Sequence, residues 1–371
     1  METLPDLPEE ILFNIFSRLP AKSIGKCRCL SKQWLNLLST KQFIKSHLAR
    51  VKQENLILTT PSHTIRSVDT IKGYDRGTVS RELAVAGRWI ASFGSCDGLL
   101  LLLNNARDLF LVNPITLEQV KIPNSPVAFN LYGGDTIYGF GYDSVRDDYK
   151  VVKVCYHAKQ SRVGIFDTFV AMYAYYTKKG FWERLESPPY DYTCPLIPSG
   201  AYVNGAYHWV GAWSRDLDCN VIAAFDFANE VFSEILPPSG VDIEDLLHFT
   251  IGVLGGCLCV IDAINDTEGL DVWIMKEYGV TDSWSKFSLA VGEYHFGDLF
   301  KPLCFIGDRE EGEVVLVIEG TRLVAYNLKE GTSMDVVVDR VPGKFVDGCT
   351  FMESLVSPVT LCGHREEQAS V

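Results

Sequence analysis

The sequence lacks an excess of positive charge: 34 Lys and Arg residues face 47 Asp and Glu residues, which leaves a net charge of −13 at pH 7. Nucleic-acid binding needs a basic surface, so the charge argues against nucleic acid as the main ligand. No apolar run approaches the roughly 18 residues of a membrane span, and the start METLPDLPEE is acidic, unlike a secretory signal. We therefore expect a soluble chain without a membrane span, located in the cytoplasm, the nucleus or both.

The cysteines lack the spacing of a zinc site or a disulfide framework. Their number, eleven, is odd, and two close pairs, Cys27/Cys29 and Cys257/Cys259, are separated by one residue, not by the two to four typical of zinc ligands. Reduced thiols are the better interpretation. We expect no structural metal and no cofactor.

The sequence also offers no arrangement typical of catalysis. The stretch Gly94–Gly98, which contains Ser and Cys, has the Gly and Asp residues of a tight turn. Asp147 and Asp148 fall in a turn, where solvated carboxylates are more common than an acid/base pair. His208 lies in an alternating strand pattern, as an ordinary core or surface histidine would. We predict no catalytic residues.

The most informative stretch is residues 7–43, which predicts three short helices. Asp6 is a candidate cap for the first, Ser31 caps the third, and the second covers residues 21–27. The first helix has one wide apolar face, and the third carries Trp34, Leu35, Leu37 and Leu38. About forty residues rarely sustain a hydrophobic core alone, so this face needs a partner or the rest of the chain.

The order Leu7-Pro8, Ile11-Leu12, Ile15, Leu19-Pro20, Lys22-Ser23-Ile24, Arg28 to Lys32 and Trp34 resembles an F-box, in the form common in plant F-box proteins. The resemblance implies docking on a Skp-type adaptor and, through it, on a cullin-based ubiquitin ligase. A helical bundle that merely packs on the remaining chain is the alternative. The adaptor-binding residues that the resemblance implies are Leu7, Pro8, Ile11, Leu12, Ile15, Leu19, Pro20, Ile24, Leu30 and Trp34.

Charge is distributed unevenly along the chain. Residues 1–50 hold eight Lys or Arg residues and four acidic ones, a net charge of +4, so the remainder carries −17. A basic head on an acidic body favours docking to an acidic partner, with charge acting mainly on the rate of encounter.

From about residue 55 the pattern becomes all-β and repeats. Five segments have an apolar strand, a polar tight turn and a second strand, and the residues that open these turns are Asn113, Tyr176, Asp226, Ile274 and Asn327. The steps between them are 63, 50, 48 and 53 residues, and each is preceded by another strand pair. Spacing near fifty with four strands per unit predicts a β-propeller, and a β-sandwich fits the strand content but not the repeat.

A sixth blade would combine the run from Asn55 with the segment 345–358 and close the ring. This region is similar to the kelch-like F-box-associated domain of plant F-box proteins, on the motifs GSCDGLLLL with LFLVNPIT, YGFGYDSVRDDYKVVKV and FMESLVSP. We thus predict a mostly β, α+β protein: a three-helix F-box (1–45), a linker (46–54), a propeller of six blades (55–360) and a polar tail (361–371).

Longer connections between strands are predicted to share one rim of the propeller and to bind an unidentified target protein. These connections include residues 156–167, 213–220 and 262–269, and the candidate residues on them are Tyr156, Asp167, Trp213, Asp216, Asp262 and Asp266. Together with the resemblance, this predicts a non-catalytic substrate receptor of a Skp-cullin-F-box ligase. A kelch-like enzyme or sugar-binding protein, or an adaptor-independent scaffold, are the alternatives.

Overall fold

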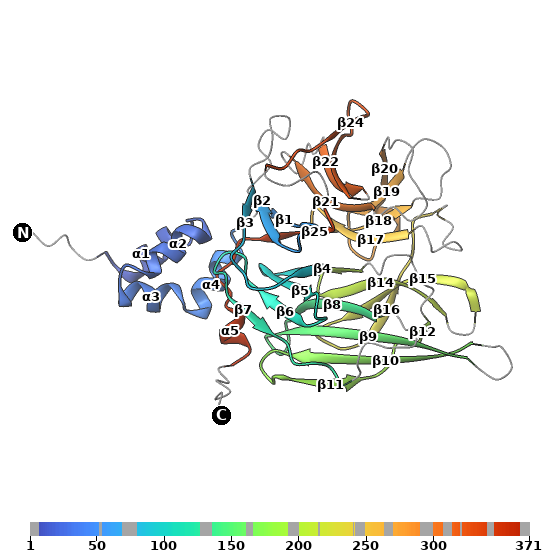
Figure 1. Ribbon diagram of the computed structural model, residues 1–371, viewed down its shortest axis with the longest axis horizontal. Coiled ribbons are helices and arrows are strands. Elements are labelled where there is room, and N and C mark those ends of the chain that lie inside the picture. The colour runs from blue at the N-terminus through green and yellow to red at the C-terminus, as the bar shows by residue number, and fades with distance from the viewer. Residues whose placement is uncertain are drawn as a thin grey trace, which may run out of the picture.

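The computed structural model shows a helical head attached to a ring of β-sheets (Figure 1). It describes residues 7–51, 54–68, 80–126, 136–160, 166–191, 200–213, 216–239, 241, 249–262, 270–289, 300–306, 314–319, 321–339 and 345–363. The head contains α1 (Glu9–Phe16), α2 (Ala21–Arg28), α3 (Lys32–Leu38) and α4 (Lys41–Leu48), and a short α5 (Pro358–Leu361) follows the last strand.

The head therefore has a fourth helix, α4, where the sequence predicted the end of a three-helix F-box (1–45) and the start of a linker (46–54). Thr40 caps α4 by accepting a hydrogen bond from the Phe43 backbone N–H at 3.2 Å, and the Phe43 side chain is fully buried. The cap at Ser31 is confirmed, since its hydroxyl accepts from the Trp34 backbone N–H at 3.1 Å. Asp6 lies outside the described residues, and Pro8 occupies the N-cap position of α1.

The described strands form six sheets, here given from the inner to the outer strand. The first is β25 (Asp347–Met352), β1 (Glu54–Thr59), β2 (Ile65–Val68) and β3 (Ser80–Glu82). The second is β4 (Trp89–Cys96), β5 (Leu99–Asn104), β6 (Leu109–Val112) and β7 (Gln119–Lys121), and the third is β8 (Thr136–Asp143), β9 (Asp148–Gln160), β10 (Phe166–Tyr176) and β11 (Phe181–Leu185).

The fourth sheet is β13 (Gly200–Val203), β14 (Ala206–Trp213), β15 (Asp216–Asp226) and β16 (Phe232–Ile235), with β12 (Tyr190–Asp191) also paired to β14. The fifth is β17 (Phe249–Leu254), β18 (Cys257–Asp262), β19 (Leu270–Met275) and β20 (Trp284–Leu289), preceded by a 3-10 turn, η2 (Thr281–Ser283). The sixth is β21 (Phe300–Ile306), β22 (Val314–Glu319), β23 (Arg322–Asn327) and β24 (Thr332–Asp335).

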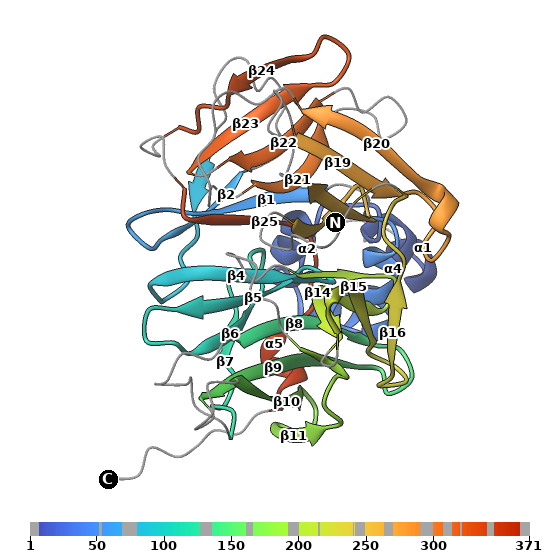
Figure 2. The same ribbon diagram turned by 90° about the vertical axis from the view of Figure 1, so that its right-hand side faces the viewer.

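The ring closes through the two ends of the propeller sequence, as predicted. Strand β25 pairs antiparallel with β1, with Asn55 opposite Phe351 and Thr59 opposite Asp347. The inner strands β25, β4, β8, β13, β17 and β21 contact one another in cyclic order. Figure 2 shows the sheets arranged around a centre, which confirms the propeller and excludes a two-sheet sandwich.

Three of the five predicted turn residues make the same pair of hydrogen bonds to the backbone of the turn. The side-chain oxygens of Asn113, Asp226 and Asn327 each accept two backbone N–H groups, two and three residues further on, at 2.6 to 3.1 Å. This is the local hydrogen bonding that makes Asn and Asp favourable in turns. The repeated turn thus has a physical cause in those sheets, whereas Tyr176 and Ile274 have no such side-chain oxygen.

Adjacent sheets interlock where glycine removes a side chain. A Cβ atom at Gly141 of β8 would lie 2.1 Å from the ring of Tyr202 of β13, so only glycine fits there. The Tyr202 hydroxyl donates to the Tyr142 carbonyl at 2.9 Å. Gly139 of β8 is constrained in the same way, because a Cβ atom there would lie 2.6 Å from the ring of Tyr207.

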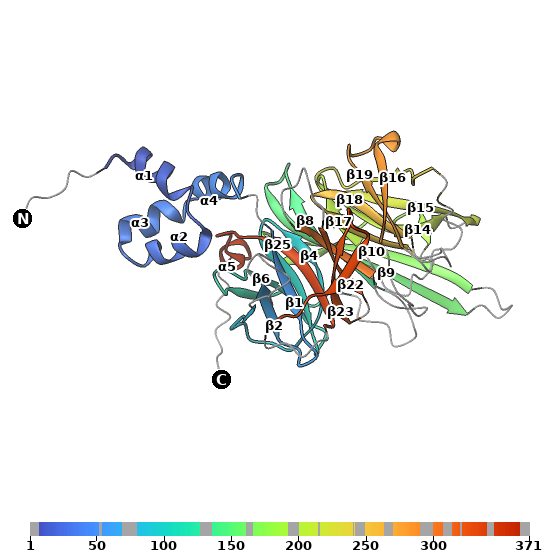
Figure 3. The same cartoon turned by 90° about the horizontal axis from the view of Figure 1, so that it is seen from above.

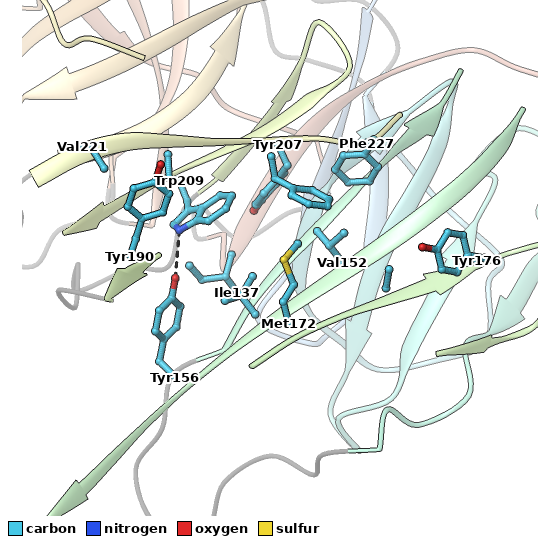
Figure 4. Close-up of a cluster of buried hydrophobic side chains, with 14 residues drawn as sticks. Ile137, Val152, Tyr156, Met172, Tyr176, Tyr190, Tyr207, Trp209, Val221 and Phe227 are labelled. Atoms are coloured by element: carbon cyan, nitrogen blue, oxygen red, sulfur yellow. Dashed lines mark hydrogen bonds between the residues drawn. The ribbon is translucent and has the colours of Figure 1, made fainter. Parts of the chain in front are cut away.

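The prediction that Tyr156 binds a target protein is wrong, because this residue is buried. It lies in β9 opposite Val170, is 3% exposed, and its hydroxyl accepts a hydrogen bond from the Trp209 indole N–H at 3.2 Å within a core between two sheets (Figure 4). The predicted loop over 156–167 is wrong, because the β9–β10 hairpin continues to Gln160 and resumes at Phe166. A buried core residue has no surface for a target.

His208 is a buried histidine, the core one of the two alternatives, core or surface, that its strand pattern left open. Its Nδ1 lies 3.1 Å from the Ala201 carbonyl oxygen and its Nε2 lies 2.8 Å from the Tyr278 hydroxyl, and the side chain is fully buried. Burial lowers the pKa of His208 to about 4, so the folded chain keeps the neutral ring in mildly acidic solution.

This histidine predicts sensitivity to acid. Because the folded-state pKa lies below the ordinary value of 6.5, stability is present above pH 6.5 and is lost as the pH falls toward 4. Between pH 7 and pH 5 the free energy of unfolding should fall by about 2 kcal/mol from this group. Urea titrations of wild type and His208→Gln at both pH values test this, and an equal pH dependence in the two proteins would contradict it.

Candidate docking face of the helical head

The four helices of the head pack around one hydrophobic core. Phe16, Ala21, Ile24, Leu37, Leu38 and Phe43 are buried together, and Phe16 meets the Trp34 ring edge-on with 5.0 Å between centroids. Arg28 donates to the carbonyl of Leu38 at 2.6 Å, which satisfies an unpaired acceptor at the end of α3. The helices thus stabilise one another, and Trp34 packs against their core through Phe16.

The other side of the head exposes apolar side chains. Leu7 is 52% exposed, Ile11 and Ile15 are each 47% exposed, and the two isoleucines lie four residues apart on one face of α1. Leu30 and Leu35, 70% and 46% exposed, lie just after α2 and on α3. Apolar side chains gathered on so small a unit mark an interaction surface.

The predicted adaptor-binding residues divide between these two sides. Leu7, Pro8, Ile11, Ile15, Pro20 and Leu30 are exposed, while Leu12, Leu19 and Trp34 are partly buried against the core. Ile24 is a correction: it is fully buried among the helices, so its role is to support them and it offers no contact surface. Leu35 is exposed but was not among the predicted adaptor-binding residues, although the sequence already placed it among the apolar residues of the third helix.

The head is also joined to the propeller through a shared core. Leu355, in the segment after β25, is 1% exposed and belongs to the core of the head. Ile44 of α4 packs against both the head core and the core around β4, β5 and β8, while Ile115 of the β6–β7 turn reaches the head core. Some apolar residues of the helices therefore pack against the propeller, in a contact that we call the seam, while others remain exposed.

Asn113 fixes the segment that carries Leu355. It is fully buried, and its amide nitrogen donates to the carbonyls of Ser354 and Val356 at 3.1 and 2.7 Å. The same segment continues from β25, the strand that closes the ring. Ring closure and head attachment thus depend on one continuous piece of chain, visible beside α5 in Figure 3.

Ion pairs reinforce the seam around Asp147. Its carboxylate pairs with Lys41 and Lys45 of α4, the latter at 2.7 Å, and accepts a hydrogen bond from the Tyr142 hydroxyl. Asp148 is 4% exposed and accepts from the Thr177 hydroxyl at 2.6 Å. The prediction of solvated carboxylates is therefore wrong for Asp148, whereas the Asp147 side chain remains 33% exposed beside its ion pairs. Two lysines of the basic head, Lys41 and Lys45, thus form ion pairs with the propeller.

The predicted target face lies on the opposite side of the ring. The head contacts the β6–β7 and β8–β9 turns, whereas β9 and β10 meet at the other ends of the same strands. In Figure 1 the head is on the left and the β9–β10 hairpin extends to the right. A target held there would be separated from the helices by the thickness of the propeller.

The structure shortens two of the predicted loops on that face. Trp213 ends β14 and pairs with Asp216 at the start of β15, so the predicted loop over 213–220 is mostly strand. Asp167 lies in β10 opposite Lys159, and Asp262 is the last residue of β18. Asp266 lies outside the described residues.

Two family descriptions match the chain. One, F-box associated beta propeller domain, covers residues 66–358, and the other, F-box domain, covers residues 4–46. The chain belongs to the F-box proteins with an F-box-associated β-propeller. Within this F-box protein the first match covers the described sheets from β2 to β25 and the second covers the head up to α4. An F-box implies a Skp-type adaptor as partner.

Curated relatives agree with this membership. "F-box protein CPR1" of Arabidopsis thaliana is 32% identical over 362 residues, which cover 91% of this F-box protein and 86% of the relative. "F-box/kelch-repeat protein At3g23880" of the same plant is 28% identical, covering 95% and 96%. A solved chain of the nidogen/laminin complex is 10% identical with a TM-score of 0.46, covering 81% and 100%, too remote to add to the argument.

The described part of this F-box protein contains no group of three or more His, Cys, Asp or Glu side chains placed to hold a metal ion. Among those residues no helix has the length and apolarity needed to cross a membrane. Cys96, in the stretch that resembled a nucleophile site, is buried, and burial raises the pKa of its thiol well above the ordinary value. The Cys96 thiol therefore stays protonated and is a poor nucleophile.

Proposed function

We propose that this chain is the substrate-receptor subunit of a Skp-cullin-F-box ubiquitin ligase. The observation that carries the proposal is the exposed apolar face of α1, with Ile11 and Ile15 each 47% exposed on a unit whose opposite side already forms a core and a seam. Burying each such side chain against the adaptor stabilises a complex by about 1.5 to 3 kcal/mol before ordering costs. The chain itself performs no bond chemistry.

The propeller would hold the target at the face opposite the head, where the sequence predicts the longer connections between strands. The rate gain comes from proximity, because a target lysine is kept near a conjugating enzyme that is bound elsewhere in the complex. A fixed seam supports this role, since Leu355, Ile44 and the Asp147 ion pairs hold the head at one orientation. The complex would work in the cytoplasm or nucleus.

Co-purification tests the proposal. The full chain, tagged and expressed in plant cells with the proteasome inhibited, should bring down a Skp-type adaptor and a cullin in stoichiometric amounts. Absence of both from a folded, soluble chain would contradict the receptor role. Adaptor without cullin, or without any ubiquitylated protein that depends on the F-box, would favour a scaffold.

A further inference from the structure

A cavity of about 600 Å³ runs through the centre of the ring and is lined by residues of all six inner strands. Its size lies in the range of small-molecule sites. Its walls are largely apolar, with Ile90, Phe93, Ile251, Leu303 and Phe351 among the lining residues. No part of the receptor function described above uses this space.

Two of the inner strands that line the cavity are irregular. The register of β4 against β5 shifts between Trp89 and Ala91 and again between Ser92 and Ser95, and that of β21 against β22 shifts between Pro302 and Cys304. The extra residues at these shifts include Ile90 and Leu303, both of which line the cavity. Bulges of this kind re-aim side chains and are common beside binding sites.

The end of the cavity away from the head carries one ion pair. Lys301, at the start of β21, donates from Nζ to Asp347 Oδ1 at 2.8 Å. The other carboxylate oxygen of Asp347 accepts from the backbone N–H and the hydroxyl of Ser92 at 2.6 and 2.7 Å, and the Gly348 backbone N–H reaches Oδ1 at 2.7 Å. Four donors satisfy this carboxylate.

The ammonium group of Lys301 retains donors after this pairing. It has three N–H bonds, and its side chain is 28% exposed within the cavity lining. Burial disfavours its charge, but the carboxylate of Asp347 outweighs burial and raises the pKa of Lys301, so the group stays cationic. The polar end of the cavity therefore offers hydrogen-bond donors to an acceptor, and a charged acceptor binds such a donor most strongly.

We propose that the central cavity binds a small organic molecule that carries one carboxylate on an apolar body, with the carboxylate at Lys301 and the body between the inner strands. Lys301 and Asp347 lie at the starts of β21 and β25, the ends of these strands nearer the face where a target protein is expected. The proposal goes beyond the receptor function and does not depend on it, because binding is measured on the full chain alone.

Saturation-transfer NMR with two defined pairs of probes tests the proposal. Octanoate and 4-phenylbutyrate should bind the folded full chain at least tenfold more tightly than octan-1-ol and 4-phenylbutan-1-ol, their uncharged counterparts. Equal binding of acids and alcohols, or binding of neither, would overturn the proposal. Binding of an acidic peptide without any of the small acids would also overturn it, in favour of a protein ligand.

Two variants locate the site. Thr250→Trp fills the cavity, because Thr250 lines it, and should abolish binding of both acids. Thr332→Trp makes the same change on the exposed outer strand β24 and should leave binding unchanged. Lys301→Met should remove the preference for acid over alcohol, with thermal melting used to confirm folding. Unchanged binding in Thr250→Trp would place the ligand elsewhere and refute the assignment.

Discussion

Replacing Ile11 and Ile15 together by aspartate is expected to lower the affinity for a Skp-type adaptor by about 10² to 10⁴-fold. Both side chains are 47% exposed on one face of α1, so the change costs little within the free chain. In the complex it removes two apolar contacts worth about 1.5 to 3 kcal/mol each. The affinity is measured by calorimetry with purified adaptor, and circular dichroism reports whether the propeller stays folded.

The matched control places the same charges on the propeller. Val280 and Val337 are exposed apolar residues there, at 44% and 68%, and their double change to aspartate should leave adaptor affinity unaltered. Leu12 is unsuitable for the test because it packs against the head core, so its loss would confuse folding with docking. Wild-type affinity in the Ile11 and Ile15 variant would show that α1 is not the docking face.

The Leu355→Asp substitution is expected to release the head from the propeller. Leu355 is 1% exposed inside the core shared with Phe16, Ile24 and Leu38, where a carboxylate would lie without a partner. Loss of the apolar contact and burial of the charge together cost on the order of 4 kcal/mol. Because every 1.4 kcal/mol is a factor of ten, that cost should raise the population of the detached head by about 10³-fold.

Limited trypsin digestion measures this release. Arg50 lies between α4 and β1, where the chain passes from the head to the propeller, so cleavage there reports loss of their attachment. Cleavage should accelerate by about the same 10³-fold, because proteolysis follows the open population when closing is fast. Leu355→Met keeps the apolar contact and should digest like wild type. Unchanged cleavage in Leu355→Asp would mean that the ion pairs at Asp147 hold the head without this core.

The division of the head into a buried and an exposed side was only partly predictable from its sequence. Ile11, Ile15 and Ile24 are the same residue type in the same repeating pattern, yet the first two face outward and the third is fully buried. Short helices carry apolar residues on more than one side, and only their packing decides which side becomes the core. The ordered motif identified the stretch but not this division.

The propeller was more predictable, because its repeat is local. Turn residues such as Asn113 and Asp226 act on backbone groups two and three residues away, so their spacing is readable along the chain. The extension of β9 to Gln160 depends on pairing across the hairpin, which local composition does not report. The pairing of Lys45 with Asp147 joins residues 102 positions apart and left no signal in the pattern.

Hydrogen exchange of the full chain with and without a purified Skp-type adaptor tests the central claim most directly. The account predicts slower exchange on adaptor binding in peptides that cover α1 and the region from Leu30 through α3, where the exposed apolar residues lie. It predicts no change in the exchange rates of β9, β10, β14 and β15, which extend to the side of the propeller opposite the head. Protection of those strands with none in the helices would contradict the assignment of the head as the docking face.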